Sequence, residues 1–71
     1  MKSFGDLKVG DFLWVNGTPE RIYGIDKYPD KWLFYTTNNI EECRFECFVS
    51  ELDYNSIYTI GEDKFSACEL L

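Results

Sequence analysis

The fold class of this chain is decided by its opening stretch, Asp6-Leu7-Lys8-Val9-Gly10-Asp11-Phe12-Leu13-Trp14-Val15. A polar segment ends at the Gly-Asp pair, and four large apolar residues then follow without a break. A short apolar run after a turn predicts a β-strand that buries side chains on both faces. Because residues two apart in a strand point to the same side, Phe12 and Trp14 share one face. In so small a chain, that face is either a second part of the core or a binding surface.

Turn residues divide the rest of the chain into short strands. Asn16-Gly17, the strongest short hairpin signal, follows the first strand. A strand is expected at 20–25, with Gly24 as a bulge or a point of close approach, and a loop at 26–30. Further strands are expected at 32–37, 57–60 and 64–67, with turns at 38–39, 53–56 and 61–63.

Two segments of the C-terminal half have patterns that are also compatible with a helix. Residues 41–49 alternate with period two, which favours a strand. A helix competes there, because Ile40, Cys43, Cys47 and Phe48 also fit helical spacing. The Ser-x-x-Glu spacing of residues 66–69 is that of a capping box and predicts one short helical turn at the end of the chain.

The size of the chain and the number of strands predict a single small barrel. Residues 1–71 form one domain, and a chain of this length buries only about 60% of its unfolded surface. Five or six short antiparallel strands in such a chain predict an all-β barrel. The run Leu7-Lys8-Val9-Gly10-Asp11 and the apolar strand after it resemble the first strand of SH3-like barrels. The resemblance implies that Leu13 and Val15 point inward and that Phe12 and Trp14 point outward or lie under a loop. Families with this fold are mostly binding modules.

The charge distribution limits the class of partner. The formal net charge is -6, with five acids against five bases in residues 1–40 and eight acids against two bases in residues 41–71. Binding to a nucleic-acid backbone requires clustered Lys and Arg, so we expect no direct nucleic-acid contact. A cationic protein partner suits the acidic half, but the favoured explanation is that the acids keep this small aromatic-rich protein soluble.

Several kinds of chemistry lack the residues that they need. The chain has no histidine, which removes the commonest general base and the usual nucleophile pairs. Three cysteines are too few for a structural zinc site, and in a strand Cys43 and Cys47 lie about 13 Å apart, too far for a disulfide. We therefore expect no enzyme activity, no metal and no cofactor. No apolar segment is long enough to cross a membrane, and the free thiols suggest a reducing cytoplasm.

The aromatic residues are the best candidates for a function. Six Phe, five Tyr and two Trp exceed what one small core needs, and aromatic side chains dominate interface hot spots. We expect a non-enzymatic module that binds a protein, or a second copy of itself, through an exposed aromatic patch. The residues expected in this patch are Phe12, Trp14, Tyr23, Trp32 and Tyr35.

A second hypothesis uses the acidic half instead. The chain resembles the small acidic proteins with which phages and mobile elements block host nucleases or defence systems. In this case carboxylates occupy a cationic groove meant for nucleic acid, and binding depends on salt. The residues expected on that acidic surface are Glu41, Glu42, Glu46, Glu62 and Asp63. A third, weaker option is a pocket in which a nucleotide base stacks on Trp or Tyr.

Overall fold

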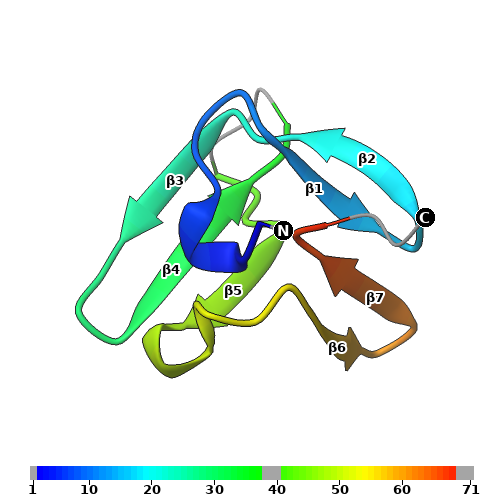
Figure 1. Cartoon of the computed structure of the whole chain (residues 1–71). Coiled ribbons are helices and arrows are strands. Elements are labelled where there is room, and N and C mark those ends of the chain that lie inside the picture. Colours follow the sequence, from blue (N-terminus) through cyan, green and yellow to red (C-terminus); the bar gives the residue numbers. More distant parts are fainter. Residues whose placement is uncertain (1, 38–40, 69–71) are drawn as a thin grey trace.

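The computed structural model describes residues 2–37 and 41–68, without the side chains of residues 57 and 58. The described residues form short antiparallel strands in two sheets, with two single-turn 3-10 helices (Figure 1). The elements in chain order are η1 (Phe4–Asp6), β1 (Phe12–Val15), β2 (Thr18–Arg21), β3 (Gly24–Lys27), β4 (Lys31–Tyr35), β5 (Phe45–Phe48), η2 (Val49–Glu51), β6 (Ser56–Ile60) and β7 (Asp63–Ser66).

The larger sheet, which we call sheet A, has the strand order β2-β1-β7-β6. Its first hairpin closes through Asn16 and Gly17, which have φ of 54° and 79°. Positive φ at both central positions is the type I′ geometry that fits the twist of a hairpin. The turn sets the register in which Val15 pairs with Thr18 and Phe12 with Arg21.

The smaller sheet, which we call sheet B, has the order β3-β4-β5. Phe34 of β4 pairs with Ile25 on one side and with Phe45 on the other, and all three face the core. The chain passes from sheet A to sheet B between β2 and β3. Ile22 there still bonds to Gly10 and Asp11 beside β1, whereas the Tyr23 N–H donates to the Tyr35 carbonyl of β4. In the described part of the chain, strand pairing does not join the sheets into a closed barrel.

The core lies between the sheets and is largely aromatic. The Phe45 ring centroid lies 5.0 Å from that of Phe4, 5.9 Å from that of Phe34 and 4.7 Å from that of Phe65. These rings come from η1, from both sheets and from distant parts of the sequence. One aromatic cluster therefore fixes the two sheets against each other.

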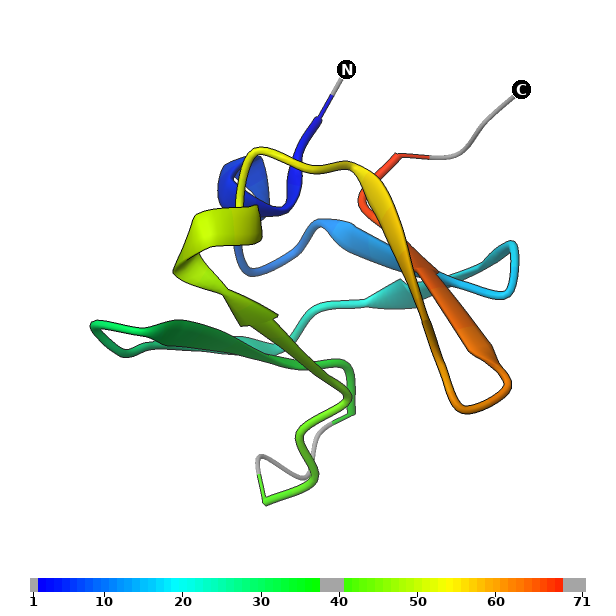
Figure 2. The same ribbon diagram turned by 90° about the horizontal axis from the view of Figure 1, so that it is seen from below.

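The two 3-10 turns lie side by side at one end of the molecule (Figure 2). The backbone N–H of Phe4 donates to the carbonyl of Tyr54, and that of Gly5 donates to the carbonyl of Leu52. A side chain at Gly5 would be crowded, because a Cβ would lie 3.2 Å from the Leu52 carbonyl oxygen. This contact carries Phe4 into the core, where it is fully buried.

Several predictions from the sequence are confirmed. The chain is all-β and antiparallel, the Asn16-Gly17 hairpin forms, and Leu13 and Val15 face the core while Phe12 is exposed. Residues 45–48 form a strand rather than a helix. The hairpin predicted near residues 61–63 also forms, with β6 and β7 as its strands.

Other predictions are wrong in detail. The structure has more strands than the five or six expected, because the predicted strand 20–25 is split at Ile22 and Tyr23 and its two halves join different sheets. The predicted loop 26–30 is shorter, because β3 continues to Lys27. The strand in 41–49 begins only at Phe45, since residues 41 and 42 form a turn and bend and Val49 opens η2. The turn at 38–39 and the end of the helical turn at 66–69 lie outside the described residues; Ser66 itself ends β7.

Candidate binding surface

The outer face of sheet A carries three aromatic side chains and a proline, which we call the β1 stripe: Phe12, Trp14, Tyr23 and Pro19. Phe12 and Trp14 point outward because Leu13 and Val15, their neighbours in β1, are buried. The hairpin register places Pro19 opposite Trp14. Phe12 is 49% exposed and Tyr23 44%, whereas Trp14 is half-buried. Three of the five residues predicted for the aromatic patch therefore lie on one surface.

Arg21 lies within this stripe. It pairs with Phe12 across the strands, and its guanidinium carbon lies 5.6 Å from the centre of the Tyr23 ring. Tyr23 continues the outward positions of β2, because the intervening Ile22 is fully buried. Backbone bonds of Ile22 with Gly10 and Asp11 extend the pairing there. The aromatic row is thus continuous with the end of β2.

The outer face of sheet A also differs in charge from the rest of the molecule. The β7 residues on this face are Lys64 and Ser66, and Ser66 pairs with Trp14. The β6 residues opposite them are Thr59 and Ser56. No described side chain on this face is acidic, although the chain has 13 acids and 7 bases.

The other two residues predicted for the aromatic patch lie elsewhere. Trp32 is on the inner side of sheet B, where it packs against the core and carries the Lys27 ammonium 4.5 Å above its ring. Tyr35 is only 8% exposed, because it pairs with Gly24 and its hydroxyl donates to Asp26 at 2.9 Å. This hydrogen bond, with some help from burial, raises the pKa of Tyr35 to about 12. The predicted five-residue patch is therefore not a single surface.

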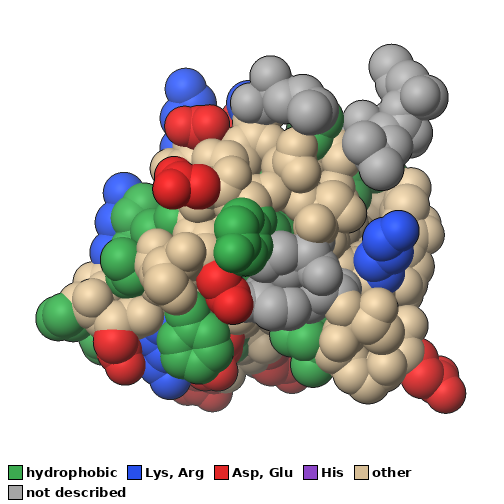
Figure 3. Space-filling view, turned by 60° about the horizontal axis from the view of Figure 1, so that its bottom comes forward, with side chains coloured by type: hydrophobic (Ala, Val, Ile, Leu, Met, Phe, Trp, Pro, Cys, Tyr) green, Lys and Arg blue, Asp and Glu red, His purple; other side chains and the backbone are tan. Residues whose placement is uncertain are grey.

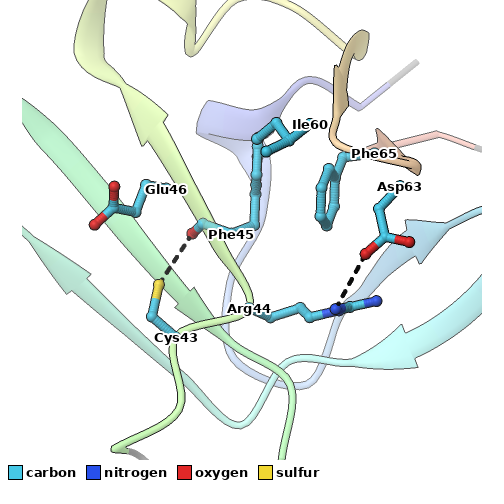
Figure 4. A pocket seen from close by; sticks show the side chains of 7 residues that line it. All are labelled: Cys43, Arg44, Phe45, Glu46, Ile60, Asp63 and Phe65. Carbon is cyan, nitrogen blue, oxygen red and sulfur yellow. Dashed lines mark hydrogen bonds and ion pairs between the residues drawn. The ribbon is translucent and has the colours of Figure 1, made fainter.

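The predicted acidic residues are only partly gathered. A cleft of about 310 Å³ opens between β5 and the β6–β7 hairpin. Its apolar lining is Phe45, Ile60 and Phe65, and its acidic residues are Glu46 and Asp63. Figure 4 shows the side chains of this cleft. Glu42 lines a neighbouring depression, while Glu41 and the turn residue Glu62 are exposed.

Arg44 is the centre of the polar groups at this cleft. Its Nε lies 3.3 Å from Glu20 Oε1, and its Nη1 lies 3.4 Å from Asp63 Oδ2. Figure 4 shows the side chain extending from the segment before β5 toward Asp63. The guanidinium carbon also lies 5.7 Å from the centre of the Phe65 ring. Glu20 is in β2 and Asp63 in β7, so Arg44 ties sheet B to sheet A, two sheets that share no strand pairing among the described residues.

A second apolar surface lies at the end of sheet B. Tyr28, Phe48 and Val49 are each more than two-fifths exposed. Figure 3 shows hydrophobic side chains gathered on the side of the molecule that carries the β3–β4 hairpin, with charged groups among them. Lys31, which pairs with Phe48, is engaged by Glu46 at 3.4 Å. This surface is therefore apolar but mixed in charge, and its Lys31 is already paired with a carboxylate.

The cysteines of β5 and of the segment before it are poor nucleophiles. Cys43 is exposed, Cys47 is buried, and neither forms a disulfide. Burial raises the pKa of the Cys43 thiol, and it raises that of Cys47 to about 11. The reactive thiolate is thus disfavoured at both positions near neutral pH.

The sequence contained a signal for the residues that the predicted patch missed. Once Asn16-Gly17 is assigned as a two-residue turn, counting outward pairs Trp14 with Pro19 and Phe12 with Arg21. Lys64 could not be found in this way, because the pairing of β1 with β7 joins segments far apart in the sequence.

In the described part of the chain, no helix has the length and apolar character that a membrane span requires.

Comparison with known proteins gives no relative: no family model, curated protein or solved structure matches the chain.

Proposed function

We propose that this protein is a non-enzymatic module that binds another protein through the β1 stripe. The observation that carries the proposal is the alignment of Phe12, Trp14 and Tyr23, with Arg21 among them, on one sheet face. Trp, Tyr and Arg are the residues most enriched at the energetic centres of interfaces. Exposed aromatic groups on a rigid sheet lose little conformational entropy on binding, which favours affinity.

The absence of catalysis is part of this proposal. It is supported by a chain without histidine and by the raised thiol pKa values of Cys43 and Cys47. Arg44, the cationic residue of the cleft, forms ion pairs with Glu20 and Asp63, so its role is structural rather than catalytic. The proposal places the protein in a reducing cytoplasm. The support is that Cys43 and Cys47 are free thiols.

The SH3-like identity of the domain also remains a proposal. Support comes from the opening strand, in which Leu13 and Val15 point inward as the resemblance implies. The Gly10-Asp11 corner precedes that strand, and Gly10 has φ of 98°. A binding role fits this fold, but the fold alone selects no partner.

A selection from a random peptide library displayed on phage tests the proposed function. Wild type is compared with Phe12→Ala and with Phe48→Ala, a matched control because Phe48 is also an exposed phenylalanine at an outward strand position. We expect peptides enriched on wild type to bind Phe12→Ala roughly tenfold or more weakly and Phe48→Ala unchanged. Equal enrichment on all three proteins, or loss only with Phe48→Ala, would refute the proposal.

The acidic inhibitor remains a second candidate, because Glu46 and Asp63 line one cleft and Glu42 lines the depression beside it. A cationic loop of a nucleic-acid enzyme would suit those carboxylates. Reversing Glu41, Glu42, Glu46 and Glu62 to Lys should then abolish capture of the target at low salt, while Phe12→Ala should not. Capture that survives the charge reversal would remove this candidate.

A further inference from the structure

We propose that the partner of the β1 stripe is a protein segment in which carboxylates alternate with, or flank, apolar side chains. The inference rests on the proposed function and adds the chemical class of the partner. It follows from the two cations on the outer face of sheet A, Arg21 and Lys64, and from the lack of acidic side chains among the residues of this face that the structure describes.

The position of Arg21 within the stripe is the first step. Its backbone pairs with Phe12, and its guanidinium group lies over the Tyr23 ring. A partner that covers Phe12 and Tyr23 must therefore also cover Arg21. Withdrawing a guanidinium from water without a counter-charge is costly, so a partner that fits this surface supplies an acceptor there.

The pairing of the other cations is the second step. Lys2, Lys31 and Arg44 each lie within 3.4 Å of a carboxylate oxygen, whereas Lys8 and Lys27 form no ion pair with any described residue and lie outside the outer face of sheet A. Arg21 and Lys64 form no ion pair with any described residue, in a chain where acids outnumber bases 13 to 7. The described carboxylates lie on other surfaces of the molecule. These two cations thus remain available to carboxylates of another molecule.

The spacing of the two cations is the third step. Arg21 lies opposite Phe12 on one side of β1, and Lys64 lies in β7 on the other side, two residues from the Ser66 that pairs with Trp14. The aromatic side chains Phe12 and Trp14 therefore lie between two positive charges. A segment crossing this face meets apolar surface at its centre and a cation at each side. Because Arg donates in a planar fork that matches a carboxylate, we assign it the main charge contact.

Nucleic acid fits these observations less well. Stacking on Phe12 and Trp14 is conceivable chemically, but two cations neutralise few phosphates, and the net charge of -6 repels a polyanion. A short acidic peptide carries far less charge and gains from apolar burial as well. We therefore commit to a protein segment and treat single-stranded nucleic acid as an outcome of the test.

The test extends the phage selection to charge variants. The library is selected separately on wild type, on Arg21→Glu and on Lys27→Glu, a control on sheet B whose cation likewise forms no ion pair within the described residues. The wild-type and Lys27→Glu pools should be enriched in Asp and Glu beside apolar residues, whereas the Arg21→Glu pool should lose that enrichment. The most enriched peptide, measured by fluorescence anisotropy, should bind Arg21→Glu about tenfold more weakly than wild type.

The possible results separate the inference from the proposed function. The inference fails and the proposed function stands if the enriched peptides depend on Phe12 but carry no excess of Asp and Glu. The same conclusion follows if the pool selected on Arg21→Glu is as rich in Asp and Glu as the wild-type pool. If no peptide distinguishes wild type from Phe12→Ala, both fail. Two other results would overturn the inference by showing that a different ligand occupies the β1 stripe. One is tighter binding of oligothymidine than of the best peptide, and the other is Phe12-dependent self-association in analytical sedimentation.

Discussion

At the scale of single residues, Tyr35 shows how a local contact overrides an expectation from composition. The sequence offered it as one of many surplus aromatic residues, but nothing in the sequence showed that a glycine, Gly24, would face it across the strands. Without a side chain at Gly24, the Tyr35 ring can lie close to the sheet, and its hydroxyl reaches Asp26. Its role is therefore to join β3 to β4.

The alkaline stability of the protein should depend on Tyr35. Its pKa is raised from the ordinary 10.0 to about 12 in the folded protein, so the unfolded chain releases this proton first. The contribution is fully present below pH 10 and is lost as the pH rises to 12. Urea unfolding at several pH values should show a decline over this interval that is smaller in Tyr35→Phe than in wild type or in Tyr54→Phe. Parallel declines in all three proteins would contradict the assignment.

At the scale of elements, the β1–β2 hairpin was predictable and its connection to β7 was not. Asn16 and Gly17 adopt positive φ, as their residue types indicate. The Asn16 side chain does more, because its amide donates to Asp63 Oδ1 at 2.9 Å and its oxygen accepts from the Lys64 N–H at 2.8 Å. The turn therefore fixes the β1–β2 hairpin to the β6–β7 hairpin. The two hydrogen bonds join residues that are separated in the sequence by 47 and by 48 positions.

Two substitutions at Asn16 separate these roles. Asn16→Gly keeps access to positive φ but removes both side-chain hydrogen bonds, and should lower the free energy of unfolding by about 1 kcal/mol. Asn16→Ala also strains the backbone and should cost roughly 1 kcal/mol more. Urea denaturation measures both values. An Asn16→Gly protein as stable as wild type would show that the link between the hairpins contributes nothing.

At the scale of the whole molecule, the sequence predicts the class of the fold but not how the sheets are held together. Alternation and turn chemistry locate most strands, because both are local properties. The transfer of the chain between sheets at Ile22-Tyr23 and the pairing of β1 with β7 depend on long-range packing. The same distinction holds for the surface. The shared outward face of Phe12 and Trp14 follows from alternation within one strand. That Trp32 and Tyr35 lie away from this face depends on how the two sheets pack, which the sequence does not show.

Arg44 should contribute to stability by joining the sheets. Arg44→Ala removes two ion pairs and the contact with Phe65, whereas Arg44→Met keeps an apolar stem over the ring. Because Arg44, Glu20 and Asp63 are each about one-third exposed, each pair contributes only about 0.5 kcal/mol. Urea denaturation should show a loss of roughly 1–2 kcal/mol for Arg44→Ala and a smaller loss for Arg44→Met. A loss of the same size in both variants would assign the effect to the charges alone, and no loss in either would contradict the role of Arg44 as the link.

The claim that the outer face of sheet A is the docking surface is tested most directly by NMR. Amide shifts of the isotope-labelled protein are followed while the peptide most enriched on wild type is added. We predict that the perturbed amides cluster on β1, β2 and β7, around Phe12, Arg21 and Lys64, with little change near Tyr28 and Phe48. Perturbations centred on the β3–β4 hairpin or on the cleft at Arg44 would contradict the account.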